Sequence, residues 1–112
     1  MSQTHTIGKT ATSVQRDPDG TLRVVYHATE VVTVDPNGTI TLRTGGWKTN
    51  TTKARMNQTA NQFGLGFQVG QSNFQWAVSV SRGDGGVTPP RVIPFDKDTL
   101  IFHPKHDQVL SL

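Results

Sequence analysis

Short turn-forming segments interrupt this chain at close intervals and limit what it can fold into. Asp17-Pro-Asp-Gly20 and Asp35-Pro-Asn-Gly38 are strong turn signals, and the segment 81–90, SRGDGGVTPP, combines glycines with a proline pair. Between these signals β-branched residues are plentiful, while the hydrophobic share of the whole chain is only 33%. A thin core built on β-sheet suits such a sequence better than a helical bundle does.

The length of 112 residues fits one domain with one modest core. We expect residues 21–104 to form this domain. Residues 1–20 carry little apolar content and are expected to be a loosely held arm or a first edge strand. Residues 105–112 are expected to form a tail that either hangs free or adds an edge strand.

Alternation of apolar and polar residues predicts one extended strand over residues 22–34. Glu30 falls on its apolar face, so either a bulge shifts the register there or Glu30 has a buried partner. The turn at residues 35–38 then closes a hairpin. The return strand, residues 39–43, places Ile40 and Leu42 in the core.

A helix is predicted from Thr51 to Phe63, with Asn50 or Thr51 as its cap and Gly64 at its end. Its buried stripe and its polar face each consist of residues at helical spacing. The stripe is Met56, Thr59, Ala60 and Phe63, and the polar face is Arg55, Asn57, Gln58, Asn61 and Gln62.

Two further hairpins are predicted after the helix. The first joins residues 66–71 to residues 74–80, and the second joins residues 91–95 to residues 99–103. The whole pattern predicts an α+β fold: a single domain with a largely antiparallel sheet of about five to six short strands and one helix packed on one face.

Charge is unevenly distributed, although the formal net charge is only +3. No acidic residue lies between Asp35 and Asp84, whereas five cations do: Arg43, Lys48, Lys53, Arg55 and Arg82. A positive middle between more acidic ends indicates an anionic partner. The alternative is an ordinary solvated face.

The segment 44–55, TGGWKTNTTKAR, coincides with the predicted helix start. A helix N-terminus offers free N–H groups, glycines allow close approach, and a tryptophan can stack on a base. The segment lacks the glycine that a Walker A loop has before its Lys-Ser/Thr pair. The alternative is a tight strand-to-helix turn with a core tryptophan and capping threonines. The predicted nucleic-acid or anion site comprises Arg43, Gly45, Gly46, Trp47, Lys48, Thr51, Thr52, Lys53 and Arg55.

Other chemistry is weakly represented in the sequence. There is no cysteine, which excludes disulfides and thiolate metal sites. His27 and Glu30 would point to opposite faces of a regular strand. His103, His106 and Asp107 could reach one metal ion, but an exposed tail is the commoner explanation. We therefore expect no enzymatic activity, no metal and no cofactor.

Four features together resemble small proteins encoded by tailed bacteriophages. They are YHATEVVTV at 26–34, the following D-x-N-G-T turn, the pattern T-L-x-T-G-G-W-x-T-x-T-T-K-x-R-M-N at 41–57, and a later hairpin that carries Phe, Val and Trp. The similarity spans residues 26–80 and is weaker over residues 93–98. It implies a phage origin and a host-cytoplasm setting, and it implies no activity and no site.

The leading hypothesis is a small non-catalytic phage module that binds nucleic acid or another polyanion through the TGGWKTNTTKAR segment. The alternatives are a protein–protein module that binds a host or phage protein or forms a homo-oligomer through a sheet face or edge, and a small virion or assembly component. No apolar run approaches the roughly 20 residues that cross a membrane. We expect a cytoplasmic protein.

Overall fold

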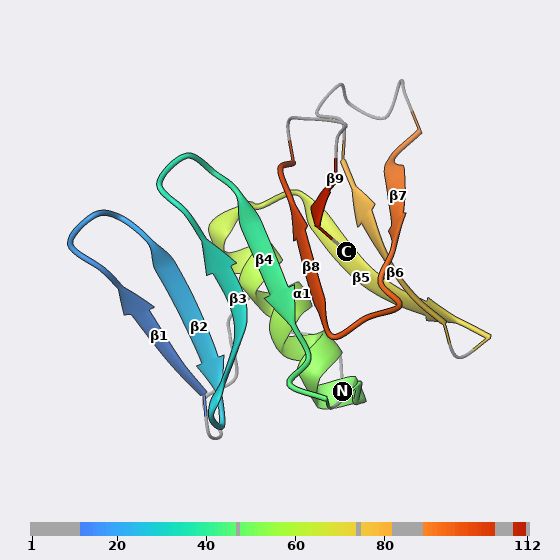
Figure 1. The fold of residues 1–112 in the computed structure, drawn as a ribbon, viewed down its shortest axis with the longest axis horizontal. Coiled ribbons are helices and arrows are strands. Elements are labelled where there is room, and N and C mark those ends of the chain that lie inside the picture. The colour runs from blue at the N-terminus through green and yellow to red at the C-terminus, as the bar shows by residue number, and fades with distance from the viewer. Residues whose placement is uncertain (1–11, 47, 74, 82–88, 105–108, 112) are drawn as a thin grey trace.

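The computed structural model describes residues 12–46, 48–73, 75–81, 89–104 and 109–111 (Figure 1). Over these residues the chain forms one helix and nine strands, which confirms the α+β class. In chain order the elements are β1 (Thr12–Arg16), β2 (Leu22–Tyr26), β3 (Thr29–Val34), β4 (Ile40–Arg43), α1 (Asn50–Phe63), β5 (Phe67–Ser72), β6 (Gln75–Val80), β7 (Arg91–Pro94), β8 (Thr99–Phe102) and β9 (Val109–Ser111).

The strands form two antiparallel sheets where the sequence predicted one. The first has the order β1-β2-β3-β4-β8-β9, and the second has the order β5-β6-β7. Helix α1 packs against β2, β3 and β5, so it lies on one face of the larger sheet and beside the smaller one (Figure 1). β1 and β9 are the outer strands of the larger sheet. For residues 1–20 and for residues 105–112, an edge strand was one of the two alternatives that the sequence allowed.

The stretch 22–34 is a hairpin, which corrects the prediction of a single strand. Tyr26 pairs with Thr29, so the reversal occurs over His27 and Ala28 alone. No glycine, proline or asparagine marks this turn. Because the residues that usually signal a turn are absent here, the alternation of apolar and polar residues predicts one continuous strand.

The bulge expected near Glu30 is present, and Glu30 has a partner, although the pair is not buried. The register between β2 and β3 shifts after Val24, which marks a bulge in the pairing. Glu30 Oε1 accepts a hydrogen bond of 2.6 Å from Arg23, whose Nε donates to Asp17 at 2.8 Å. These side chains are about one-third exposed, so the carboxylate is paired at the surface and not buried.

The turn at residues 35–38 forms as predicted. The Asp35 N–H donates to Thr39 O and the Gly38 N–H donates to Asp35 O, each at 2.9 Å. Gly38 has a left-handed φ of 91°, which a residue with a Cβ rarely adopts. The return strand β4 carries Ile40 and Leu42 into the core, where both are fully buried.

The predicted hairpin of residues 91–103 is wrong. β7 pairs with β6 and β8 pairs with β4, so the two segments belong to different sheets. The reason is long-range apolar pairing: Leu100 lies opposite Leu42, and Phe102 lies opposite Ile40. The short connection that leaves β7 therefore crosses from one sheet to the other.

Helix α1 begins and ends where local signals place it, within one or two residues. Thr49 is the cap, one residue before the predicted candidates, and Gly64 ends the helix with φ 62°. Met56, Thr59 and Ala60 of the predicted stripe are buried, while Phe63 is half-buried.

Asn57 and Gln58 are buried, which corrects their assignment to a solvent-facing side of the helix. The Asn57 amide donates to Val69 O at 3.0 Å and accepts from the Val69 N–H at 2.7 Å. β5 is the edge of its sheet, so the backbone of Val69 on that side has no neighbouring strand. The side chain of Asn57 takes the place of that strand.

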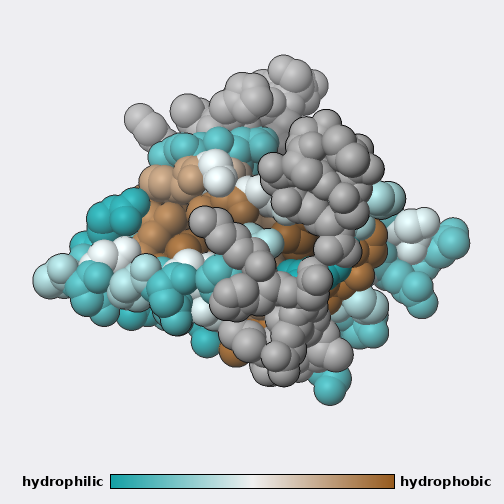
Figure 2. Space-filling model, turned by 90° about the horizontal axis from the view of Figure 1, so that it is seen from above, coloured by the Kyte–Doolittle hydropathy of each residue, from teal (hydrophilic) through white to brown (hydrophobic). Residues whose placement is uncertain are grey.

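One apolar core joins both sheets and the helix. Phe67 of β5 meets Phe102 of β8 edge to face at 5.9 Å between ring centroids, and Trp76 of β6 meets Phe95 at 6.0 Å. Seen from above, apolar residues form a band between hydrophilic residues on both sides (Figure 2). Phe74 lies outside the described residues.

Replacing Asn57 with alanine should destabilise the protein by about 2–4 kcal/mol, because two buried backbone groups of Val69 would lose their partner. Urea unfolding monitored by circular dichroism measures this change. Asn61→Ala on the same helix is the matched control, since Asn61 is exposed, and should change stability by about 0.5 kcal/mol or less. Equal effects of the two variants would contradict the role assigned to Asn57.

Candidate functional site

The TGGWKTNTTKAR segment connects the end of β4 to the start of α1. Its first three residues form a turn that is held in place by Asp98, a carboxylate on the connection between β7 and β8. The Thr44 hydroxyl donates to Asp98 Oδ1 at 2.6 Å, and the Gly46 N–H donates to the same oxygen at 2.7 Å. The Thr44 N–H also donates to the backbone oxygen of Asp98 at 2.9 Å.

These bonds lower the pKa of Asp98 below its ordinary value of 3.8, because the Thr44 hydroxyl and the Gly46 N–H stabilise the charged carboxylate. Gly46, a residue of the predicted anion site, thus donates its N–H to a carboxylate of the protein itself.

Both glycines of the turn adopt left-handed conformations, with φ 65° at Gly45 and φ 84° at Gly46. They differ in their surroundings. A Cβ added at Gly45 would lie 3.0 Å from Thr29 Cγ2 and closer still to the Thr29 hydroxyl, whereas a Cβ at Gly46 would meet nothing within 4 Å. Glycine is therefore favoured at residue 45 for two reasons, the left-handed backbone conformation and the close approach of Thr29.

Lys48 is used within the fold. Its Nζ donates to the backbone oxygens of Phe95 at 3.0 Å and Asp96 at 2.9 Å, and it lies 5.8 Å from the centroid of the Phe95 ring. The cation thus fixes the connection between the two sheets. Trp47, its neighbour in the predicted site, lies outside the described residues.

The remaining cations of the predicted site lie on different sides of the molecule. Arg43 alternates with the buried Leu42, so its side chain lies on the opposite face of the sheet from the helix. Lys53 and Arg55 are two residues apart on α1 and project about 200° apart around its axis. The structure does not gather these cations into one patch.

Arg55 is the cation that lies over an aromatic residue of the larger sheet. Its Nε donates to Thr12 Oγ1 at 2.9 Å and its Nη1 donates to Gln58 Oε1 at 3.2 Å. Its guanidinium carbon lies 5.5 Å from the centroid of the Tyr26 ring. Arg55 therefore joins helix α1 to the first two strands.

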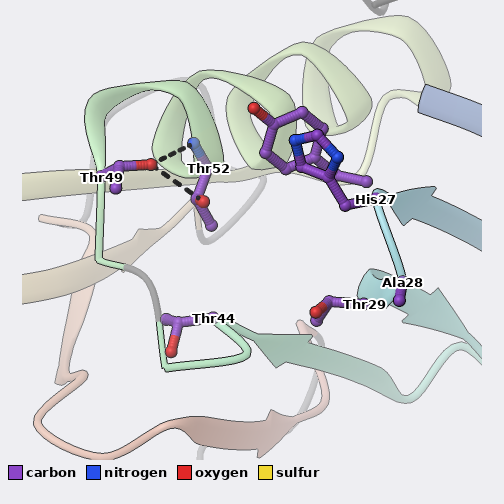
Figure 3. Close-up of a pocket in the computed structure, with 7 residues that line it drawn as sticks. His27, Ala28, Thr29, Thr44, Thr49 and Thr52 are labelled. Carbon is purple, nitrogen blue, oxygen red and sulfur yellow. Dashed lines mark hydrogen bonds between the residues drawn. The ribbon is translucent and has the colours of Figure 1, made fainter. Parts of the chain in front are cut away.

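A pocket of about 450 Å³ opens between the β2–β3 turn, the Thr44–Gly46 turn and the start of α1. In Figure 3, Thr49 and Thr52 approach it from the helix, His27 lies across from them, and Thr29 and Thr44 lie on the side of the turns. No carboxylate belongs to its described lining, which is Tyr26, His27, Ala28, Thr29, Thr44, Thr49 and Thr52.

The helix side of the pocket is the capped first turn of α1. Thr49 Oγ1 accepts from the Thr52 N–H at 3.2 Å and lies 3.1 Å from Thr52 Oγ1. No acidic residue occurs in this turn. Asn50 and Thr51 are exposed, and as the first residues of the helix their N–H groups have no acceptor within it.

The opposite side carries Tyr26 and His27, which do not belong to the predicted site. His27 adopts a left-handed conformation with φ 55°, and its ring centroid lies 4.3 Å from that of Tyr26 at an interplanar angle of 52°. In the sequence His27 was considered only together with Glu30, and Tyr26 only as part of the YHATEVVTV stretch. Only the hairpin turn, which lacks a sequence signal, brings them to the pocket.

Two histidine-containing groups were discounted from the sequence as metal or catalytic sites: His27 with Glu30, and His103 with His106 and Asp107. His27 lies in a turn while Glu30 pairs with Arg23, so the two do not form a joint site. His103 Nε2 lies 2.9 Å from Asn37 O, and His106 and Asp107 lie outside the described residues. Within the described ranges, no group of three or more His, Cys, Asp or Glu side chains could hold a metal ion. Within those same ranges, no helix is long and apolar enough to cross a membrane.

Gly45→Ala should destabilise the protein more than Gly46→Ala. Both variants force a Cβ into a left-handed conformation at a cost of about 1–2 kcal/mol, but only Gly45→Ala also displaces Thr29, which should add about 1–3 kcal/mol. Urea unfolding of both variants measures the difference. In a Thr29→Ala background the extra cost should largely disappear, and a difference that persists there would show that contact with Thr29 is not its cause.

Stability should fall in acid partly because of Asp98. Its pKa is lowered in the folded state, so its contribution is fully present above the ordinary carboxyl pKa and is lost as the pH falls through the lowered value. Asp98→Asn should therefore unfold with a smaller loss of stability between about pH 5 and pH 2. Asp96→Asn, at an exposed residue of the same connection, should keep the wild-type dependence. Parallel curves for wild type and Asp98→Asn would contradict this role.

Comparison with known proteins identifies a family. No curated protein and no solved structure matches the chain. The model of the family described as "Kyanoviridae Gp96 protein" matches residues 1–101, which supports a phage origin. Because this match spans most of the chain, the protein belongs to the Kyanoviridae Gp96 family of phage proteins.

Proposed function

We propose that this phage protein is a non-catalytic binding module that contacts single-stranded nucleic acid, in the cytoplasm of the infected host, at the start of helix α1. The observation that carries the proposal is the pocket of about 450 Å³ at an acid-free helix N-terminus. The N–H groups of such a terminus attract phosphate, and a pocket with an aromatic wall suits a base.

Two cations lie near the start of the helix, on different sides of it, and each can contact a different phosphate of a strand that passes the helix start. Lys53 is half-exposed in the first turn, and Arg55 lies beside Tyr26 of the pocket wall. The glycine pair contributes less than its sequence suggested, since the Gly46 N–H is bonded to Asp98. Phosphate contacts are therefore assigned to the helix start and its cations, in place of the glycines.

No reaction is assigned to the pocket. Its described lining contains neither a carboxylate nor a cysteine, and its one histidine, His27, makes no ion pair with an acid of the described chain. General acid–base catalysis by histidine ordinarily needs a partner that orients the ring. Binding is the chemistry that these side chains support.

A second candidate function is a protein–protein module that binds a host or phage protein or a second copy. It is favoured by β1, the outer strand of the larger sheet, whose residues 13–16 are all exposed. Val14 at its centre is 46% exposed, and an open edge strand can pair with another chain. Such an interface would depend on an apolar anchor such as Val14 and much less on salt.

The test is fluorescence anisotropy of labelled single-stranded oligonucleotides at two salt concentrations. Binding should weaken as salt rises, and Lys53→Ala and Arg55→Ala should each reduce the slope of log K against log salt by about 0.7–1 unit. Lys97→Ala, at an exposed residue outside the helix and the strands, should leave the slope unchanged.

Two outcomes would overturn the proposal. One is an absence of binding at low salt, which would favour the protein–protein function. The other is binding whose salt dependence survives the double variant Lys53→Ala/Arg55→Ala. Because Arg55 also bonds to Thr12 and Gln58, a thermal melt of each variant must show that the fold is retained.

A further inference from the structure

The wall of the pocket formed by the β2–β3 turn consists of two neighbouring rings. The Tyr26 and His27 centroids are 4.3 Å apart, and the planes are inclined at 52°. Arg55, itself bonded to Thr12, lies 5.5 Å from the centroid of the Tyr26 ring and restrains it from the helix side. Tyr26 is thus held in position while His27 remains exposed at the rim.

His27 occupies a position that ordinarily belongs to glycine. It is the first of the two turn residues between the paired Tyr26 and Thr29, and its φ is 55°. A residue with a Cβ is disfavoured in this conformation, and glycine is the usual choice at the first position of such a turn. A strained residue at the edge of a pocket is a reason to look for a function of its side chain. Here the side chain is a flat ring.

The rest of the pocket offers hydroxyl groups and no negative charge. Thr29 makes no side-chain hydrogen bond within the described part of the chain, and Thr49 accepts from the Thr52 N–H. The Thr44 hydroxyl donates to Asp98, which lies behind it and does not line the pocket. The Thr29 hydroxyl can both donate to and accept from the polar edge of a small planar ligand, whereas the Thr44 hydroxyl, whose one O–H is donated to Asp98, can only accept.

The dimensions also suit a small planar ligand. A volume of about 450 Å³ lies within the usual range of about 300–1,000 Å³ for small-molecule sites. The N–H groups of Asn50 and Thr51 begin the helix beside it, so a phosphate attached to the ligand can remain outside. A nucleotide has this arrangement of a flat ring and an external phosphate.

We propose that the pocket takes one unpaired base of a single-stranded nucleic acid, stacked on the exposed ring of His27 and in contact with the ring of Tyr26, because planes inclined at 52° cannot both lie parallel to one base. The inference rests on the proposed function and adds to it the part of the ligand that enters the protein. Stacking of a base on aromatic side chains does not depend on sequence, because every base has a π-face. The site would therefore distinguish strands with bases from strands without them.

The experiment compares oligothymidylate with an abasic strand of the same length and the same phosphate charge. Tyr26 is the single tyrosine of the chain, so ring-labelled tyrosine gives one set of NMR signals that needs no assignment. Oligothymidylate should shift these signals upfield in a saturable way, and the abasic strand should not. Anisotropy should show that oligothymidylate binds about tenfold more tightly.

The two failures can be told apart. Equal affinity for both strands, with Tyr26 signals unmoved, would overturn base insertion and leave polyanion binding intact. An absence of binding of either strand at low salt would overturn the proposed function and the base site together. Neither result depends on a variant that has to fold.

Variants of His27 test the ring directly. Glycine adopts φ 55° without strain, so His27→Gly should melt no lower than wild type, yet its preference for oligothymidylate should fall from about tenfold to near parity. His27→Phe restores a ring and should retain the preference. Loss of preference in both variants would show that stacking at residue 27 is not its source, and an unchanged preference in His27→Gly would do the same.

Discussion

The hydrogen bonds that converge on the Asp98 carboxylate are the constraint on which the site depends. Thr44 and Gly46 donate to it from the turn that leads into α1, and Asp98 itself lies between the two sheets on the connection from β7 to β8. Lys48 binds the backbone of that same connection. The start of the helix is therefore placed by contacts with a segment about fifty residues later in the sequence.

Local signals account for the parts of the fold that could be predicted. The left-handed glycines Gly38 and Gly64 end their elements as expected, and Ile40 and Leu42 face the core. The errors lie where partners distant in sequence decide the structure. The apolar residues of β8 pair with β4, and Asn57 completes the edge of β5. The spacing of apolar residues indicates whether a segment is a helix or a strand, but it does not identify the strand or helix that packs beside that segment.

The segment that the sequence singled out borders the pocket through Thr44, Thr49 and Thr52, but the placement of its charges could not be predicted from the sequence. Arg43, Lys53 and Arg55 are close in sequence, yet strand alternation and helical rotation direct them to different sides. The pocket beside this segment is formed in part by the turn at His27, and no glycine or proline signals that turn in the sequence. The glycines and cations of residues 44–55 thus indicated where to expect a site. The aromatic wall of the pocket arises only from the tertiary structure.

This dispersal of charge determines what kind of binding the site can support. With Lys53 and Arg55 as its two nearby cations, the helix start can neutralise about two phosphates, which corresponds to a salt slope of about −1.4 on a single strand. Asp98 places a negative charge behind the Thr44 wall and offsets part of that attraction. If the site binds nucleic acid as proposed, charge alone gives weak binding, and the rings of Tyr26 and His27 would supply most of the selectivity. A residue in a strained conformation at the rim is consistent with that division of roles, because relieving the strain with glycine would remove the ring.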